Sequence, residues 1–282
     1  MFINSKRFRT IIIKITAIAI LILFAGSLSS CSGQAESTII VVGSTSVQPF
    51  AELLAEEFES SHPGENIDIQ GGGSAAGIMA AEEGIAEIGM SSRSLKDDEQ
   101  GLLVVEIAKD GLAIVVHPKN PVADLTLEQI RDIYTGEITN WGQVNGQDAQ
   151  IHLIAREDGS GTRGAFEDLV MGKEYRITPK AIVQNSNGAV KQLVSDDPDS
   201  IGFISLGLAE VDNKVKALRL DGVEATRENV INHSYGLFRP FLFVFKTQPE
   251  GIARQFVDYV LSEEGQQILI HEGLIPGKGA EE

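Results

Sequence analysis

The sequence contains a single cysteine, Cys31, so it cannot form an internal disulfide bond. Basic residues are also few, because 23 lysines and arginines stand against 40 acidic residues and the formal net charge is −17. Residues 1–30 carry four of the basic side chains and no acidic one, so their removal takes the charge to −21. A surface this acidic repels nucleic acid and anionic lipid. We expect neither as a partner, and the core alone must hold the fold.

Motifs of several enzyme and cofactor-binding classes are absent as well. The sequence has no H-E-x-x-H, nucleophile-elbow or S-x-x-K motif. The segment GGGSAA (71–76) matches G-x-G-x-x-A, but Met90, Ser91 and Ser92 replace the acidic residue that a dinucleotide site needs at the end of the next strand. The five histidines lack metal-ligand spacing and are His62, His117, His152, His233 and His271. We therefore expect no catalytic residue, no metal and no cofactor.

The one long apolar run, residues 11–24, follows a basic start and ends in LSSC. This order predicts a signal peptide over residues 1–30, with Cys31 lipidated as the new first residue and 31–36 as a tether. The alternative is a retained transmembrane anchor, but Lys14 interrupts the run and LSSC offers a cleavage point. We expect a protein on the extracytoplasmic face of the cell membrane, attached only through its lipid.

Alternating short apolar runs and amphipathic stretches predict an α/β fold for the rest of the chain. Three segments, 37–58, 66–84 and 151–171, have the order strand, glycine- and hydroxyl-rich turn, helix. Hydroxyl residues stand where the three helices would begin, namely Ser46, Ser74, and either Ser160 or Thr162. Each could simply cap its own helix. If the three helix starts converge, however, their dipoles sum to about +1.5 charges and suit a small dianion.

A fourth stretch, IGMSSRS (88–94), ends an expected strand with Ser91, Ser92 and Arg93. It could form another wall of the same site, or it could be a surface turn with a solvated arginine.

Eight segments in order resemble the phosphate-binding proteins of Pst-type ABC importers, which belong to the periplasmic-binding-protein class. The resemblance covers nearly the whole mature chain. The segments are GSTSVQP, GGGSAAG, EIGMSSRSL, TGEITNWGQV, REDGSGTR, QNSNGAVKQLV, IGFISLG, and RPFLFVF followed by FVDYVLSEEGQQI.

The resemblance implies a type II-like fold of two α/β lobes, with two hinge crossings and a ligand cleft between the lobes. The first lobe would comprise residues 37–112 and 238–282, and the second would comprise 113–237. The apolar segments GLAIVVHP and YGLFRPFLFVF are the expected crossings.

The resemblance also implies the residues that bind the oxyanion, with Arg156 as the one full charge among them. They are Thr45, Ser46, the Val47 N–H, Ser74, Ser91 or Ser92, Arg156, Ser160, Gly161 and Thr162. Ser92 stands where the family has an aspartate that accepts the phosphate proton. We expect Asp158 to supply this acceptor; alternatively, Asp158 only orients Arg156, and the acceptor is Ser91, Ser92 or a backbone carbonyl.

The implied function is that of a monomeric receptor that captures inorganic phosphate and delivers it to the permease subunits of an ABC importer. Sulfate or molybdate would be the alternative ligand. A secreted phosphatase and an acidic adhesion lipoprotein are functions of other classes, but the sequence offers a phosphatase neither a metal site nor an activated nucleophile.

Overall fold

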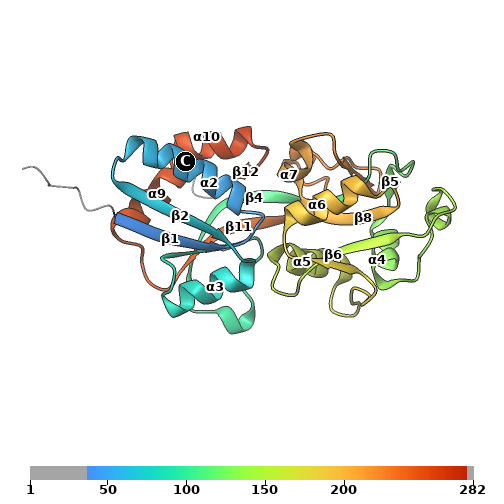
Figure 1. Ribbon diagram of the computed structural model, residues 1–282, viewed down its shortest axis with the longest axis horizontal. Coiled ribbons are helices and arrows are strands. Elements are labelled where there is room, and N and C mark those ends of the chain that lie inside the picture. The colour runs from blue at the N-terminus through green and yellow to red at the C-terminus, as the bar shows by residue number, and fades with distance from the viewer. Residues whose placement is uncertain (1–36, 278–282) are drawn as a thin grey trace, which may run out of the picture. The chain divides into compact units, whose positions relative to one another are not determined.

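Strands and helices alternate along residues 37–277, the part of the chain that the computed structural model describes (Figure 1). The expected signal peptide, Cys31 and the tether lie outside these residues. The strands are β1 (Ser37–Gly43), β2 (Glu65–Gly71), β3 (Ile88–Ser91), β4 (Leu103–Val116), β5 (Asp124–Leu125), β6 (His152–Arg156), β7 (Ile182–Gln184), β8 (Ser200–Ser205), β9 (Lys216–Ala217), β10 (Arg219–Leu220), β11 (Phe238–Phe245) and β12 (Ile275–Pro276).

The helices are α2 (Gln48–Ser61), α3 (Ser74–Glu83), α4 (Leu127–Thr135), α5 (Gly161–Phe166), α6 (Asn187–Asp196), α7 (Leu206–Glu210), α8 (Arg227–Ile231), α9 (Gly251–Leu261) and α10 (Glu263–His271). Short 3-10 turns are η2 (Asp97–Glu99) and η3 (Trp141–Val144), and the π-helical turn η4 (Glu167–Met171) continues α5. The three predicted strand–turn–helix units are confirmed as β1–α2, β2–α3 and β6–α5. No helix within residues 37–277 has the length and hydrophobicity needed to span a bilayer.

A ten-stranded sheet runs through these residues in the order β2-β1-β3-β11-β4-β8-β6-β7, with β9 and β12 also pairing with β4. The strands β1, β2 and β3 are parallel, as are β6, β7 and β8, which is the arrangement that strand–helix–strand units produce. The long strand β4 joins the two parallel groups. Its first part pairs with β11 and its last part, Leu112–Val116, pairs with β8.

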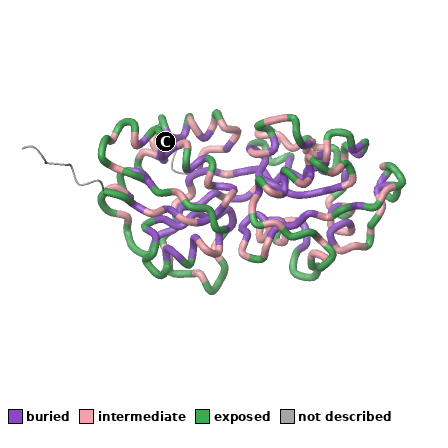
Figure 2. The backbone as a smooth tube through the Cα atoms, viewed as in Figure 1, coloured by how far each residue is buried: buried purple, intermediate pink, exposed green. Residues whose placement is uncertain are grey.

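Two large hydrophobic cores lie on either side of this junction, and together they define two lobes. One core draws its buried residues from 39–108 and 241–274, and the other draws them from 112–237. The division crosses β4 and β11 at the same level, because Asp110 of β4 lies opposite Arg239 of β11. Figure 2 shows buried backbone running through this region. The two paired strands are therefore the covalent and hydrogen-bonded connection between the lobes.

The apolar residues of β11 alternate between two faces of the sheet. Phe241, Phe243 and Phe245 belong to the core under α2 and α9, whereas Leu242 and Val244 pack with Ile78 of α3. Because successive strand residues point to opposite faces, an uninterrupted apolar run is what a strand covered by helices on both sides requires.

Phe203 of β8 is the centre of an aromatic group in the second core. Its ring stacks on Phe166 with 4.1 Å between centroids, and Tyr134 lies 5.5 Å away. We expect Phe203→Ala to lower the free energy of unfolding by about 3–5 kcal/mol, because it removes a fully buried ring and leaves a cavity. Urea denaturation would measure this, with the exposed Ile182→Ala as the control. A loss no larger than that of the control would contradict the assignment of Phe203 to the core.

Candidate functional site: an anion-binding cluster between the lobes

Ser46, just before α2, is the centre of a hydrogen-bonded cluster that joins the two lobes. Its Oγ lies 2.7 Å from Thr162 Oγ1, at the start of α5. It also accepts hydrogen bonds from Asn187 Nδ2, at the start of α6, and from Arg239 Nη2 of β11 at 3.0 Å. All four residues are buried. Elements far apart in the sequence thus bring polar groups together in a water-excluded place.

The direction of these hydrogen bonds follows from counting lone pairs. A hydroxyl oxygen has two lone pairs and one proton. Asn187 and Arg239 occupy both lone pairs of Ser46, so Ser46 donates its proton to Thr162. The Thr162 hydroxyl accepts this proton and keeps its own available for a ligand oxygen.

A second group of hydroxyls surrounds Ser92, at the end of β3. The Ser92 N–H donates to Ser74 Oγ at 3.0 Å, and Ser92 Oγ lies 2.8 Å from Ser44 Oγ and 3.4 Å from Ser74 Oγ. Gly161 packs directly against these side chains, because a Cβ atom there would overlap Ser74 Oγ and lie 2.6 Å from Ser92 Oγ. A backbone hydrogen bond from Ala75 N to Gly159 O, 3.0 Å, joins the same two turns. The cleft is therefore closed at this point.

Ser91 and Arg93 do not join the cluster. Ser91 Oγ donates to Arg93 O and accepts from Arg93 N, so it serves only the local turn. Arg93 is buried and pairs with both oxygens of Glu99 at 2.6 Å. The alternative of a solvated arginine is therefore wrong, and of the two neighbouring serines only Ser92 meets Ser74.

Arg156, the last residue of β6, is only 1% exposed. Its Nε and Nη2 donate to the two carboxylate oxygens of Glu157 at 3.0 and 2.8 Å, and Nη2 also reaches Asn185 O at 3.3 Å. Its Nη1 is buried and has no hydrogen-bond partner among residues 37–277. Glu157 therefore fixes the guanidinium while one N–H group stays free for an anion.

Asp158 lies away from the cluster, contrary to the expectation that it braces Arg156 or faces the ligand. Its side chain is 91% exposed, and it pairs with Arg163 at 2.7 Å. Arg163 also donates to Glu167 and to the carbonyl oxygen of Arg156. Because Arg163 is held in this way, its ion pair places the Asp158 carboxylate on the outside of the turn. The brace of Arg156 is the neighbouring acid, Glu157.

Only some of the predicted caps are used as caps. Ser160 accepts a hydrogen bond from Arg163 N at the start of α5, whereas Val47 and Gly73 occupy the N-cap positions of α2 and α3 and neither helix has a side-chain cap. The hydroxyls of Ser46 and Ser74 bind across the cluster instead. The alternative that each hydroxyl merely caps its own helix is therefore wrong for two of the three units.

The remaining predicted groups lie in the first turn of the same region. The Val47 N–H donates to Ser44 O at 3.1 Å, so it is already engaged in the turn that starts α2. Thr45 Oγ1 is buried and has no partner within the described residues. A hydroxyl in this state can donate to a ligand or accept from one.

Sequence reasoning missed two residues of the cluster, Asn187 and Arg239. The signal for Asn187 was present, because β7, the cap Ser186 and α6 repeat the strand–turn–helix order of the other units. Arg239 stands in an apolar strand, where an arginine needs a buried partner. That partner is Asp110 of β4, whose Oδ2 accepts from Arg239 Nη2 at 3.0 Å.

Burial acts on both members of this ion pair. It raises the pKa of the Asp110 carboxyl, although Arg239 and the Ser205 hydroxyl oppose the rise. It lowers the pKa of the Arg239 guanidinium, and the positive charge of Arg156 acts in the same direction while Asp110 opposes it. The cluster therefore contains two buried guanidinium groups within electrostatic reach of each other, and an anion would stabilise both.

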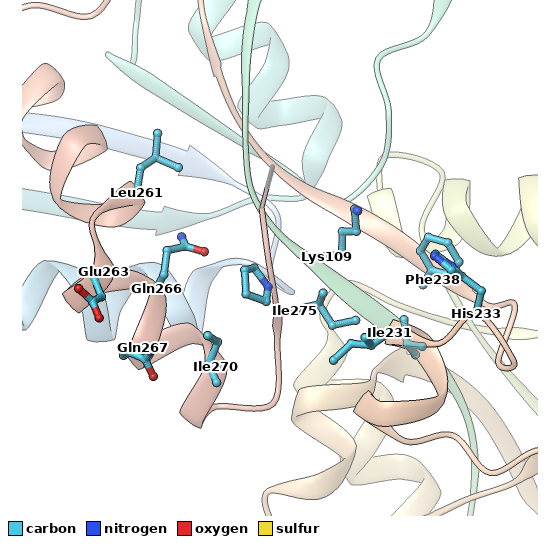
Figure 3. A pocket seen from close by; sticks show the side chains of 12 residues that line it. Lys109, Ile231, His233, Phe238, Leu261, Glu263, Gln266, Gln267, Ile270 and Ile275 are labelled. Carbon is cyan, nitrogen blue, oxygen red and sulfur yellow. The ribbon is translucent and has the colours of Figure 1, made fainter. Parts of the chain in front are cut away.

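A cavity of about 690 Å³ lies away from the cluster, between α8, α10 and β12 (Figure 3). Apolar side chains such as Ile231, Ile270 and Ile275 line much of it, and Glu263 lies at its edge. Lys109, His233, Gln266 and Gln267 also line this cavity, but none of the residues expected to bind an oxyanion does. Within the described residues, no group of three or more histidine, cysteine or acidic side chains could hold a metal ion.

Comparisons with known proteins agree on one family. A sequence model of the PBP superfamily domain matches residues 29–264. The phosphate-binding protein PstS of Bacillus subtilis is 32% identical and aligns with 86% of this chain and 82% of its own length. The PstS of Borreliella burgdorferi is 30% identical over 92% and 97%. This chain belongs to the PstS phosphate-binding protein family.

Solved structures support the family and the predicted two-lobed fold. A Clostridium perfringens protein described as a phosphate ABC transporter substrate-binding protein, with bound phosphate, is 48% identical with a TM-score of 0.82, covering 85% of this chain and 99% of that one. An ABC-type phosphate transport receptor from Vibrio cholerae is 40% identical with a TM-score of 0.70, over 84% and 99%. The resemblance and fold class inferred from the sequence are confirmed.

The close packing of Gly161 gives this family member a site where one methyl group should prevent closure. We expect Gly161→Ala to abolish high-affinity ligand binding, because its Cβ would overlap Ser74 across the cleft, while each lobe keeps its own core. Calorimetric titration and a thermal melt would measure both properties. The control is Gly188→Ala in α6, where a Cβ would meet nothing within 4 Å. Normal binding by the Gly161 variant would contradict the closed arrangement.

Proposed function

We propose that this chain is an extracytoplasmic receptor that captures inorganic phosphate and delivers it to the permease subunits of an ABC importer. The observation that carries the proposal is the cluster around Ser46, where both lobes contribute donors and two buried guanidiniums keep free N–H groups. The phosphate bound to the Clostridium perfringens relative supports the same ligand class. Hydroxyl and guanidinium donors of this kind suit a small tetrahedral anion.

The donors suit any tetrahedral oxyanion, so one acceptor must distinguish phosphate from sulfate or molybdate. We assign this role to Asn187 Oδ1, which is buried and without a partner in the described part of the chain. Its Nδ2 is held by Ser46, which fixes the carbonyl oxygen as an acceptor. Protonated phosphate can donate to it, whereas the lone pairs of sulfate would clash with it. Asp158 is exposed and paired with Arg163, so Asn187 replaces it as the proposed acceptor of the phosphate proton.

The ligand would be enclosed by closure of two lobes, residues 37–112 with 238–282 and residues 113–237. The positions of the two hydrophobic cores support these boundaries. The crossings β4 and β11 would act as the hinge. The first lobe would supply Thr45, Ser74 and Ser92, and the second would supply Arg156, Gly161, Thr162 and Asn187. Ser46, whose hydroxyl is fully used, would orient Thr162, Asn187 and Arg239.

We also propose that the protein binds its ligand without changing it. A phosphatase would need an activated nucleophile or a metal ion. Ser46, the most connected hydroxyl of the site, contacts an amide, a guanidinium and another hydroxyl, and none of these groups is a general base at neutral pH. Relatives named as binding proteins and transport receptors support the same view.

Attachment to the membrane would depend on the LSSC segment and Cys31, outside the described residues. The acidic surface offers no electrostatic attraction to anionic lipid, so the lipid would be the only anchor. We also propose that the protein acts as a monomer.

Arg156 should dominate the affinity for phosphate. We expect Arg156→Ala to weaken binding by about 2–5 kcal/mol, because the change removes a desolvated cation and leaves Glu157 unpaired. Calorimetric titration with phosphate, sulfate and a phosphomonoester would measure this and test the function itself. Heat with phosphate alone supports a phosphate receptor, whereas hydrolysis of the ester would overturn the proposal.

Two nearby variants serve as controls for Arg156. Arg163→Ala and Asp158→Asn each break the ion pair on the outer side of the turn, in which Asp158 is 91% exposed and Arg163 is 20% exposed. Asp158→Asn should change phosphate affinity by less than about 1 kcal/mol, as expected for an exposed carboxylate in an ion pair. Arg163→Ala also removes a hydrogen bond to Arg156 O, so its effect should be larger than that of Asp158→Asn but far smaller than that of Arg156→Ala. Losses equal to that of Arg156→Ala would mean that the wrong arginine has been assigned to the site.

Membrane attachment should be lost in Cys31→Ala, because this residue is the only one that the LSSC segment can present for lipidation. The variant should appear as soluble mature protein or as unprocessed precursor in cell fractionation. A variant that is still membrane-bound at its mature size would contradict the lipid anchor while leaving phosphate capture untouched.

A further inference from the structure

Asp110 and Arg239 form a buried ion pair where the two lobes meet. They lie opposite each other on β4 and β11, in the short stretches between the two hydrophobic cores. Arg239 Nε and Nη2 donate to Asp110 Oδ2 at 3.2 and 3.0 Å, and Ser205 Oγ donates to Asp110 Oδ1 at 2.9 Å. Both charged side chains are only 1% exposed. The carboxylate is therefore fully occupied and holds the guanidinium in one orientation.

Arg239 has more donors than this pairing uses. Its Nη2 also reaches Ser46 Oγ, the centre of the cluster, while Nη1 is buried with no partner among residues 37–277. Leaving a charged N–H without a partner in a buried place is costly. An ion pair that served only to join the strands would not need a buried guanidinium group that stays without a partner.

Arg156 shows the same arrangement from the second lobe. Glu157 holds its Nε and Nη2, and its Nη1 is also free. Each of the two arginines is thus fixed by its own carboxylate and keeps a buried Nη1 group without a partner among residues 37–277, and the two charges lie close enough for Arg156 to act on Arg239. Two fixed cations match two negative charges on one small ligand better than they match one.

We propose that Arg239 is a second ligand-contacting cation, which together with Arg156 makes the site select doubly charged over singly charged tetrahedral oxyanions. This inference rests on the proposed phosphate function, and it adds that the site selects its ligand by charge. Asp110 is the positioning residue that fixes Arg239. Because the pair spans the crossing strands, the second charge of the ligand is bound by the hinge itself.

The ionisation of phosphate near neutral pH provides the test, because it converts a monoanion into a dianion within the range where the protein is folded. The charged groups around Arg239 are Asp110 of β4, Arg156 of β6 and Glu210 at the end of α7, which lies near Asp110. Burial and the charge of Asp110 raise the pKa of Glu210. Protonation of Glu210 at acid pH would remove a negative charge near the site and so strengthen anion binding in acid. This is opposite in sign to the tighter binding at alkaline pH that the second arginine predicts.

Phosphate affinity should be measured by calorimetry on the acid and alkaline sides of this ionisation, for the wild type and for Arg239→Gln. We expect the wild type to bind more tightly on the alkaline side. Arg239→Gln should lose about ten- to a hundredfold in affinity there, and clearly less on the acid side. The matched control is Arg219→Gln, which breaks a half-exposed arginine–aspartate pair with the same change in charge.

A double variant, Asp110→Asn with Arg239→Gln, separates binding from folding. Arg239→Gln alone leaves a buried carboxylate without its cation, which destabilises the fold. The double variant replaces the pair by two neutral amides, so its melting temperature should recover while its preference for the dianion stays lost.

Three results would overturn the inference. If the double variant folds and binds phosphate like the wild type at both the acid and the alkaline pH, the pair is only structural. If the affinity of Arg239→Gln for phosphate falls by the same factor at both pH values, Arg239 contacts the anion without selecting its charge. If the wild type binds no phosphate on either side, the proposed function fails and this inference fails with it.

Discussion

The arrangement of the site depends on the buried pair of Asp110 and Arg239. A buried charge without a partner is strongly destabilising, so β4 and β11 must pair in the register that places these two residues opposite each other. That register sets where the first core ends and the second begins, and it carries one guanidinium to Ser46. A shift of one residue would turn Arg239 to the other face of the sheet and remove it from the cluster.

Binding an anion with so acidic a chain requires donors that act at short range. The net charge of −17 opposes the approach of any anion, and salt weakens this effect beyond about a Debye length. Within the cluster, fixed hydroxyls, helix starts and two guanidiniums are buried, and the low dielectric of the interior strengthens each interaction. The acids Asp110 and Glu157 offset part of the charge of the two arginines, but they also fix the orientation of both guanidinium groups. The protein thus uses its own carboxylates to orient the cations.

Much of the fold and part of the site could be predicted from the sequence. Glycine- and hydroxyl-rich turns after apolar runs placed Ser46, Ser74, and either Ser160 or Thr162 at helix starts, because that pattern depends on local structure alone. Which hydroxyl caps a helix and which binds across the cluster could not be predicted, since the partners of Ser46 are Thr162, Asn187 and Arg239, all far away in the sequence. For the same reason the sequence suggested Asp158 as the partner of Arg156, whereas the structure has Glu157 in that place. Arg239 was missed because its role depends on pairing with Asp110 across a long sequence distance.

The place of β11 in the sheet also bears on how the chain can fold. β11 lies between β3 and β4, yet β3 ends at Ser91 and β11 begins only at Phe238. The second core is complete by Leu237, whereas the first core still lacks its middle strand at that point of the chain. Until β11 arrives, β3 lacks its neighbour and β4 keeps an open edge, which favours pairing with other chains. Closing so long a loop is slow, so the inserted lobe can form first while the lobe that contains the N-terminal strand is the last to become whole.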